Sequence, residues 1–192
     1  LADQESIPKE WVTGKLGVSA QTISGLEKAG AIKVVSSSSF RNPVKLERTE
    51  ENRNILSGGQ QRIVREIMED YDGGNPDTYL LHGITGSGKT EVYMQLIEEM
   101  LSRGKQAIVL IPEIALTYQT LLRFYRRFGE RVSVMNSTLS SGEKYDQCER
   151  AKAGEIDIII GPRSALFTPF PQIGIIVMDE EHEGSYKSES TP

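Results

Sequence analysis

The segment GITGSGKT at residues 83–90 has the residue types and spacing that bind a nucleotide phosphate. It matches the pattern G-x-x-x-x-G-K-[S/T], in which glycines let the backbone curl so that its N–H groups surround the phosphate. Lys89 would reach the β- and γ-phosphates, and Thr90 would offer its hydroxyl to Mg²⁺. We therefore expect ATP and Mg²⁺ to bind here, through Gly83, Thr85, Gly86, Ser87, Gly88, Lys89 and Thr90.

A second candidate site follows the apolar run at residues 175–178, where the sequence continues Asp179-Glu180-Glu181-His182. Four polar residues at the end of a buried strand suggest a cation or a reaction. Asp179 is the natural second ligand of a Mg²⁺ that also meets Thr90, and Glu180 could accept a proton from an attacking water. Lys89, Asp179 and Glu180 are thus the predicted catalytic residues.

Gln60 is a candidate for recognising the base of the nucleotide. It precedes a helix predicted at residues 62–71. A glutamine amide carries a donor and an acceptor, which match N6 and N7 of adenine. A glutamine at the start of a helix is also common as a solvated residue, so both interpretations stay open.

Two further strand ends carry groups that suit a nucleic-acid strand. The segments PEIALT at residues 112–117 and GPRSA at 161–165 each follow an apolar run. Their hydroxyls and guanidinium could contact the phosphates of a strand that crosses the edge of the sheet. The candidates are Thr117, Arg163 and Ser164, although ordinary loops contain the same residue types.

These motifs lie on an alternation of apolar runs and amphipathic stretches. Strands are predicted at residues 79–82, 107–111, 132–135, 156–160 and 175–178, and helices at 89–103, 116–128 and 140–153. Nearly all-apolar strands are typical of a parallel sheet covered by helices on both faces, which predicts a doubly wound α/β fold. Ligands of such folds bind at the carboxyl ends of the strands, where the motifs lie. A run of arginines on or after the second helix is typical of a solvated face: Arg123, Arg126, Arg127 and Arg131.

The first 45 residues are expected to form a separate module. Residues 8–16 and 20–29 are predicted helices around a turn at Gly17, with Ser19 as the cap of the second helix. The strand-like residues 32–35 and a wing containing Phe40 and Arg41 would complete a winged helix. Whether this module touches DNA or only protein stays open. Residues 46–54 are the expected linker, and 55–192 the α/β lobe.

Composition excludes several classes of protein. The 192 residues carry a net charge of −5 and 38% hydrophobic residues, with a single cysteine, Cys148, that can form no intrachain disulfide. No apolar run approaches 18 residues, so we expect no membrane span and no signal peptide, and a cytoplasmic location. Net charge is +1 over residues 1–58 and −6 over 59–192, which argues mildly against nucleic-acid binding. We expect the chain to be a fragment of a longer protein.

In order and spacing, these motifs resemble motifs Q, I, Ia, Ib and II of the superfamily 2 helicases. The segments GITGSGKTEVY, PEIALT, RSALFTPF and DEEH with SYK are similar, more narrowly, to bacterial replication-restart helicases, over nearly the whole chain. The resemblance implies a RecA-like P-loop lobe after a winged-helix module, in an ATP-driven 3′-to-5′ DNA helicase that acts at stalled forks. It implies that His182 couples the site to a second lobe.

The resemblance also implies features outside these residues: a second lobe with an arginine finger, a zinc-binding insertion and a domain that binds DNA ends. The implied partners are DNA forks and single strands, primosome proteins and single-strand-binding protein. Asn136 and Pro162 depart from the family pattern. The alternative is a P-loop NTPase of another class, a kinase or transport ATPase; the segments at 112–117 and 161–165 count against it. The fragment alone is expected to be inactive.

Overall fold

The computed structural model describes residues 12–13, 17–34 and 55–186. The chain divides into two compact units, Leu1–Ser39 and Phe40–Pro192. In the part of the chain that the structure describes, no helix is long and apolar enough to span a membrane.

The described part of the first unit is built around helix α2 (Ala20–Lys28). Ser19 caps it, because its side chain accepts a hydrogen bond from the Thr22 N–H at 3.1 Å. Ile23 is buried, and no strand forms at residues 32–34, where the sequence pattern predicts one. Most of the predicted first helix and the wing lie outside the described residues, so the winged helix stays a prediction.

The second unit contains a four-stranded sheet in the order β2-β3-β1-β4. Its strands are β1 (Gln106–Leu110), β2 (Val132–Val134), β3 (Ile158–Gly161) and β4 (Ile173–Met178), and every neighbouring pair is parallel. All four carboxyl ends therefore lie at one edge, as expected for the predicted α/β fold. Gly161 ends β3 beside the Met135 carbonyl, where a Cβ atom would clash.

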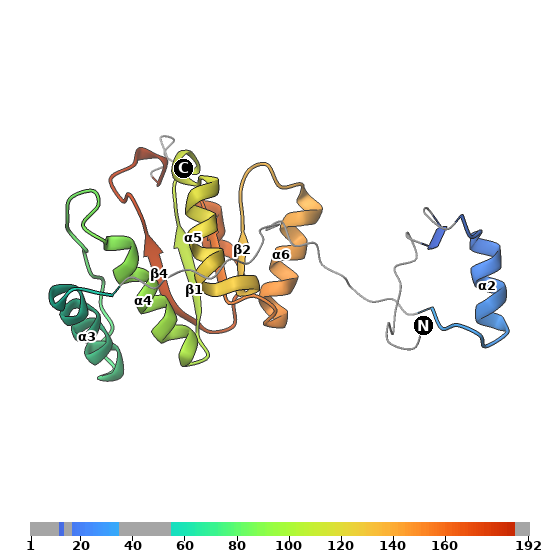
Figure 1. Cartoon of the computed structure of the whole chain (residues 1–192), viewed down its shortest axis with the longest axis horizontal. Helices are drawn as coiled ribbons and strands as arrows, with labels where there is room; N and C mark the ends of the chain where they lie inside the picture. Colours follow the sequence, from blue (N-terminus) through green and yellow to red (C-terminus); the bar gives the residue numbers. More distant parts are fainter. Residues whose placement is uncertain (1–11, 14–16, 35–54, 187–192) are drawn as a thin grey trace, which may run out of the picture. The chain divides into compact units, whose positions relative to one another are not determined.

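Helices cover both faces of this sheet (Figure 1). Residues of α4 (Lys89–Ser102) and α5 (Tyr118–Phe128) pack with Ala107 and Val109 of β1 in one core cluster. Alternate residues of β1, Ile108 and Leu110, belong to a second cluster that includes Ala151 of α6 (Ser141–Ala153). Helix α3 (Gly58–Asp72) packs on α4 in a third cluster. The predicted lobe is therefore a layered α/β structure.

The predicted strand at residues 79–82 is wrong: this segment is extended but pairs with no strand among the described residues. Leu80 is 76% exposed, and only Leu81 packs against the α3–α4 cluster. The Tyr79 hydroxyl donates to Asp70 of α3 at 2.6 Å, so side chains rather than a strand ladder hold the segment. The edge strand β4 is covered less completely than the other strands. Ile176 and Met178, on one of its faces, are half-exposed.

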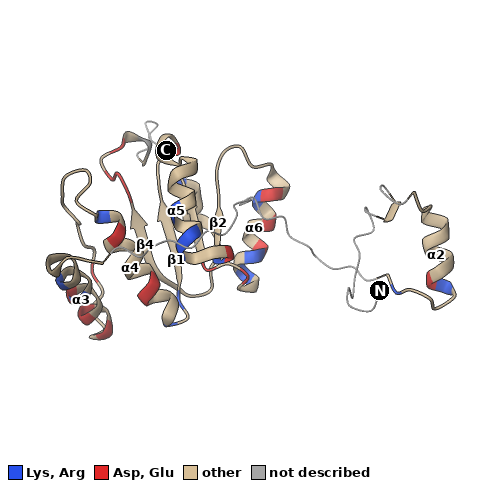
Figure 2. Cartoon of the chain, in the orientation of Figure 1, with Lys and Arg blue, Asp and Glu red and all other residues tan. Residues whose placement is uncertain are grey.

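The expectation of a solvated arginine run also fails at one position. Arg127 lies on the side of α5 that faces α4, and its side chain is only 7% exposed. Its guanidinium contacts Glu91, Gln95 and Glu98 of α4, each at 3.0 Å. Figure 2 shows acidic and basic residues interspersed along α3, α4 and α6, which agrees with the acidic net charge of this unit.

Candidate functional site

The loop of residues 83–90, called the phosphate loop below, connects the extended segment before it to α4. Gly86 and Gly88 have φ values of 81° and 84°, a left-handed conformation that side chains other than glycine rarely adopt. A Cβ atom at Gly83 would lie 2.7 Å from the Ser87 Oγ. The Ser87 N–H donates to the Ile84 carbonyl at 3.1 Å and closes the turn. The backbone path therefore requires glycine at positions 86 and 88, and a side chain at position 83 would force the Ser87 hydroxyl to move.

This backbone path leaves the start of α4 suited to an anion. Gly88 is the N-cap residue, and no side chain caps the helix. The first N–H groups of a helix have no intrahelical acceptor and lie at the positive end of its dipole. A phosphate would supply the missing acceptor, so the loop fits the phosphates of a nucleotide.

Lys89 occupies the interior of the phosphate loop. Its Nζ donates to the carbonyls of Gly83 at 2.7 Å and Ile84 at 3.2 Å. The ammonium group is thus held by loop carbonyls at the point toward which phosphate oxygens would come. Thr85 and Ser87 are exposed on the same loop.

Asp179 is brought to the phosphate-loop helix by the sheet. Its N–H donates to the Leu110 carbonyl at 2.9 Å, which extends the β1–β4 pairing by one residue. Its Oδ2 accepts from the hydroxyl of Tyr93 on α4 at 3.0 Å. Thr90 lies one helical turn before Tyr93 on α4, so both predicted Mg²⁺ ligands lie near this tyrosine.

Glu180 has a left-handed backbone with φ at 51°, alone among the non-glycine residues that the structure describes. Its N–H turns back to donate to Asp179 Oδ1 at 3.0 Å. Its carboxylate stays half-exposed and lies 3.5 Å from His182 Nε2, while Glu181 lies 3.8 Å from His182 Nδ1. Strained backbone of this kind is frequent at functional sites, and here it belongs to a residue whose carboxylate is half-exposed.

Tyr186 closes the segment that follows Asp179. Its hydroxyl donates to the Asp179 carbonyl at 2.8 Å. Burial, with the charges of Asp179, Glu180 and Glu183, raises the pKa of Tyr186 to about 12. The Arg163 guanidinium donates to the Tyr186 carbonyl at 3.5 Å, which joins the loop after β3 to the loop after β4.

Gln60 contacts the phosphate loop rather than standing free. Its Nε2 donates to the Ser87 carbonyl at 3.1 Å, and its Oε1 accepts from the Ser57 N–H at 2.8 Å as part of a capping box on α3. Both ends of the amide are therefore engaged. The adenine contact stays a prediction, and it requires that the side chain give up these partners.

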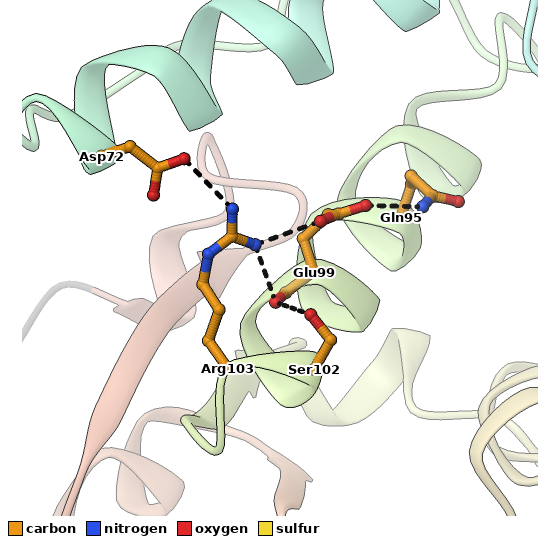
Figure 3. A network of polar contacts seen from close by, with 5 residues as sticks. All are labelled: Asp72, Gln95, Glu99, Ser102 and Arg103. Carbon is orange, nitrogen blue, oxygen red and sulfur yellow. Dashed lines mark hydrogen bonds and ion pairs between the residues drawn. The ribbon is translucent and has the colours of Figure 1, made fainter.

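A second contact joins the C-terminal end of α3 to the C-terminal end of α4 (Figure 3). Arg103 donates to Asp72 at 3.2 Å, and to the side chain and carbonyl of Glu99 at 3.1 and 3.0 Å. Gln60 at one end and Asp72 at the other thus hold α3 along the phosphate-loop helix. This arrangement keeps Gln60 beside the loop.

The three candidate nucleic-acid contacts lie at the same edge of the sheet as the phosphate loop. Thr117 is exposed, and its hydroxyl caps α5 by accepting from the Thr120 N–H at 3.3 Å. Arg163 and Ser164 are exposed in the turn after β3. Because β1 and β3 are parallel neighbours, the two loops are adjacent. A contact of these residues with DNA stays a prediction.

Metal binding at this site would use few protein ligands. Among the described residues, no group of three or more His, Cys, Asp or Glu side chains is arranged to hold a metal ion. Mg²⁺ bound with a nucleotide usually takes one or two carboxylates, with phosphate oxygens and waters completing its octahedron. Asp179 and Thr90 fit that pattern, since Asp179 accepts from Tyr93 of α4 and Thr90 lies one turn earlier on the same helix.

The sequence assigned no role to Tyr93, Tyr186 or Arg127. Tyr93 lies three residues after Thr90 on an apolar helix face, a position typical of a core residue. Burial, followed by the nearby charge of Asp179, raises its pKa above the ordinary tyrosine value, so the hydroxyl keeps its proton and acts as a donor. The signal available was the spacing, because residues three apart share one side of a helix.

Comparison with known proteins agrees with this geometry. Residues 55–191 match the family described as type III restriction enzyme, res subunit. Replication restart protein PriA of Bacillus subtilis is 43% identical over 187 residues, which cover 97% of this chain and 23% of that protein. PriA of Chlamydia muridarum is 40% identical over 186 residues (96% and 25%), and PriA of Haemophilus influenzae 46% over 141 residues (73% and 19%).

The chain thus spans about a quarter of the length of the curated relatives it matches. The expected resemblance to replication-restart helicases is confirmed by similarity that extends through the phosphate loop and the Asp179 segment. The RecA-like α/β lobe is confirmed by the parallel sheet and by the family match over residues 55–191. By its sequence, the chain belongs to the family of the type III restriction enzyme res subunit and is similar to the replication restart proteins PriA.

Proposed function

We propose that this chain is the ATP-binding lobe of a DNA-dependent motor, an ATP-driven 3′-to-5′ helicase that acts in replication restart. The observation that carries the proposal is the hydrogen bond between Tyr93 and Asp179. It joins the residue after β4 to α4, the helix that begins with Lys89 and Thr90 of the phosphate loop. The sheet therefore brings a phosphate-binding loop and a carboxylate together at one edge, as hydrolysis of a nucleoside triphosphate requires.

Each site residue has a distinct task in this proposal. The N–H groups of the phosphate loop and the Lys89 ammonium bind the β- and γ-phosphates and stabilise the charge that develops on them. Thr90 and Asp179 hold Mg²⁺, which when bound supplies positive charge to the phosphate oxygens. Glu180 accepts the proton of the attacking water, for which its exposed, outward carboxylate is suited.

Contact with DNA is proposed for the loops that follow β1 and β3. The hydroxyls of Thr117 and Ser164 and the guanidinium of Arg163 would contact backbone phosphates, which position a strand without reading its sequence. His182, beside the Glu180 carboxylate, would couple the site to a second lobe. Forked DNA, primosome proteins, single-strand-binding protein and a zinc site are proposed for the complete protein.

The isolated chain is proposed to bind Mg·nucleotide weakly and to hydrolyse it negligibly. Phosphoryl transfer in two-lobed motors uses an arginine from the facing lobe, and such a finger contributes roughly 10³–10⁵ in rate. The net charge of −6 over residues 59–192 also repels DNA at long range. The few phosphate contacts proposed here would give weak, strongly salt-dependent binding.

The test is the ATPase activity of the complete protein that contains this chain, with and without forked DNA. We expect DNA to raise turnover strongly. A turnover that is equal with and without DNA would contradict the proposal and favour a P-loop NTPase of another class, such as a kinase or a transport ATPase. The variant Lys89→Ala serves as the control for contaminating ATPases.

A further inference from the structure

Tyr93 occupies a position between the nucleotide site and the core of the lobe. It is 7% exposed and belongs to the core cluster between the sheet, α4 and α5. Its ring stacks on Phe124 of α5, with ring centres 6.2 Å apart and planes at 18°. The ring therefore cannot swing away from the sheet without opening the core, and the direction of its hydroxyl is set by packing.

The hydroxyl at the end of this fixed ring contacts one of the predicted metal ligands and lies on the same helix as the other. It donates to Asp179 Oδ2 at 3.0 Å, and Thr90 lies one helical turn before Tyr93 on α4, on the same side of the helix. A buried tyrosine hydroxyl normally finds a partner, but a backbone carbonyl would have been sufficient. Here the partner is the carboxylate that the nucleotide site needs at a defined distance from Thr90.

Within the described part of the chain, the other hydrogen bond to the Asp179 carboxylate is a local one. Its Oδ1 accepts from the N–H of the next residue, Glu180, at 3.0 Å. The Glu180 contact comes from a loop whose backbone is strained, whereas the Tyr93 contact comes from a buried helix. Among the described residues, the Tyr93 hydroxyl is the side-chain donor to this carboxylate, and it links the carboxylate to α4.

We propose that Tyr93 is a positioning residue for Mg²⁺: its hydroxyl orients the Asp179 carboxylate toward Thr90 before the metal and nucleotide arrive. The proposal rests on the proposed function, since it assigns Asp179 and Thr90 to the metal. Outer partners of metal ligands orient them, and loss of such a partner typically weakens metal affinity or activity by 10–100-fold. Phosphate binding by the loop itself does not depend on this hydroxyl.

The variant Tyr93→Phe removes the hydroxyl and keeps the stacked ring. In the complete protein, binding of a fluorescent ADP analogue is titrated with Mg²⁺ and is measured separately in EDTA. We expect the Mg²⁺ concentration for half-maximal enhancement of binding to rise about 10-fold or more. Affinity in EDTA should change by less than about 2-fold. Tyr125→Phe is the matched control, because Tyr125 is equally buried on α5; it should leave both quantities unchanged.

A second arm tests whether Tyr93 acts through Asp179. If it does, Tyr93→Phe adds little in an Asp179→Asn background, since the group it orients has already been altered. Additive losses would overturn the proposal, as would an unchanged Mg²⁺ requirement in Tyr93→Phe or an equal loss of affinity with and without Mg²⁺. Failure of the proposed function is distinguishable, because it would appear in the wild type as nucleotide binding that does not respond to Mg²⁺.

Discussion

The substitution Lys89→Ala separates the role of this lysine in binding from its role in the fold. In the structure the ammonium makes two hydrogen bonds, to the carbonyls of Gly83 and Ile84. Both carbonyls belong to a loop that water can reach, so they regain solvent partners when the lysine is removed. We expect the loss of both bonds to cost about 1–2 kcal/mol of the free energy of unfolding.

That cost predicts a small change in melting temperature and a large one in turnover. A change of 1 kcal/mol shifts the melting temperature of a domain of this size by roughly 2–4 °C, so a fall of about 2–8 °C is expected. Loss of a preorganised positive side chain that stabilises the phosphoryl group during its transfer lowers the rate of hydrolysis by about 10²–10³-fold or more. We therefore expect a folded protein in which DNA-stimulated ATP hydrolysis is abolished.

The assay is steady-state ATP hydrolysis by the complete protein at saturating single-stranded DNA, beside a thermal melt without nucleotide. Lys105→Ala is the matched control: Lys105 lies before β1, at the opposite end of the strands, and its Nζ donates to Gln172 at 3.0 Å. It should keep full turnover. Retained DNA-stimulated hydrolysis in Lys89→Ala would refute the assignment of the phosphate loop.

The remaining substitutions distinguish residues of the proposed active site from residues that stabilise the fold of the lobe. Glu180→Gln should leave Mg·ATP binding nearly unchanged while turnover falls roughly 10²-fold or more, whereas Asp179→Asn should raise the Mg²⁺ requirement itself; an equal loss of nucleotide binding in both would make Glu180 a metal or structural residue. Arg127→Ala leaves two partly buried carboxylates of α4 without their guanidinium and should cost about 2–3 kcal/mol in denaturant unfolding. Arg103 is more exposed, so Arg103→Ala should lower the free energy of unfolding by about 1 kcal/mol or less. Equal losses in the two variants would contradict the argument that burial makes the Arg127 ion pairs the more important ones.

Much of the lobe could be predicted because its signals are local. The apolar runs that form β1, β2, β3 and β4 differ in hydrophobicity from the residues on either side of them in the sequence. The helix boundaries coincide with caps that short-range chemistry defines: Ser140 and Glu143 form a capping box at the start of α6, and Gly154 ends that helix in a left-handed conformation. The phosphate loop could be predicted for the same reason, because its glycines and its lysine lie close together in the sequence, within residues 83–90.

The errors concern features that depend on distant parts of the chain. Residues 79–82 have the composition of a strand, but strand formation requires a neighbour to pair with, and the local pattern does not contain that information. Arg127 lies in an amphipathic helix among other arginines, and its burial depends on acidic residues presented by α4. Tyr93 resembles a core residue until Asp179 is placed beside it by the β1–β4 pairing.

The most direct test of the central claim, that this chain is the ATP-binding lobe of a two-lobed motor, uses residues 1–192 alone. Mg·ATP binding and steady-state hydrolysis are measured with and without saturating single-stranded DNA, beside the complete protein. We expect weak binding of Mg·nucleotide and hydrolysis lower than that of the complete protein by roughly 10³-fold or more, because the arginine of the second lobe is not among these residues. Turnover close to that of the complete protein would show that the catalytic set is complete within these residues and would contradict the two-lobed account.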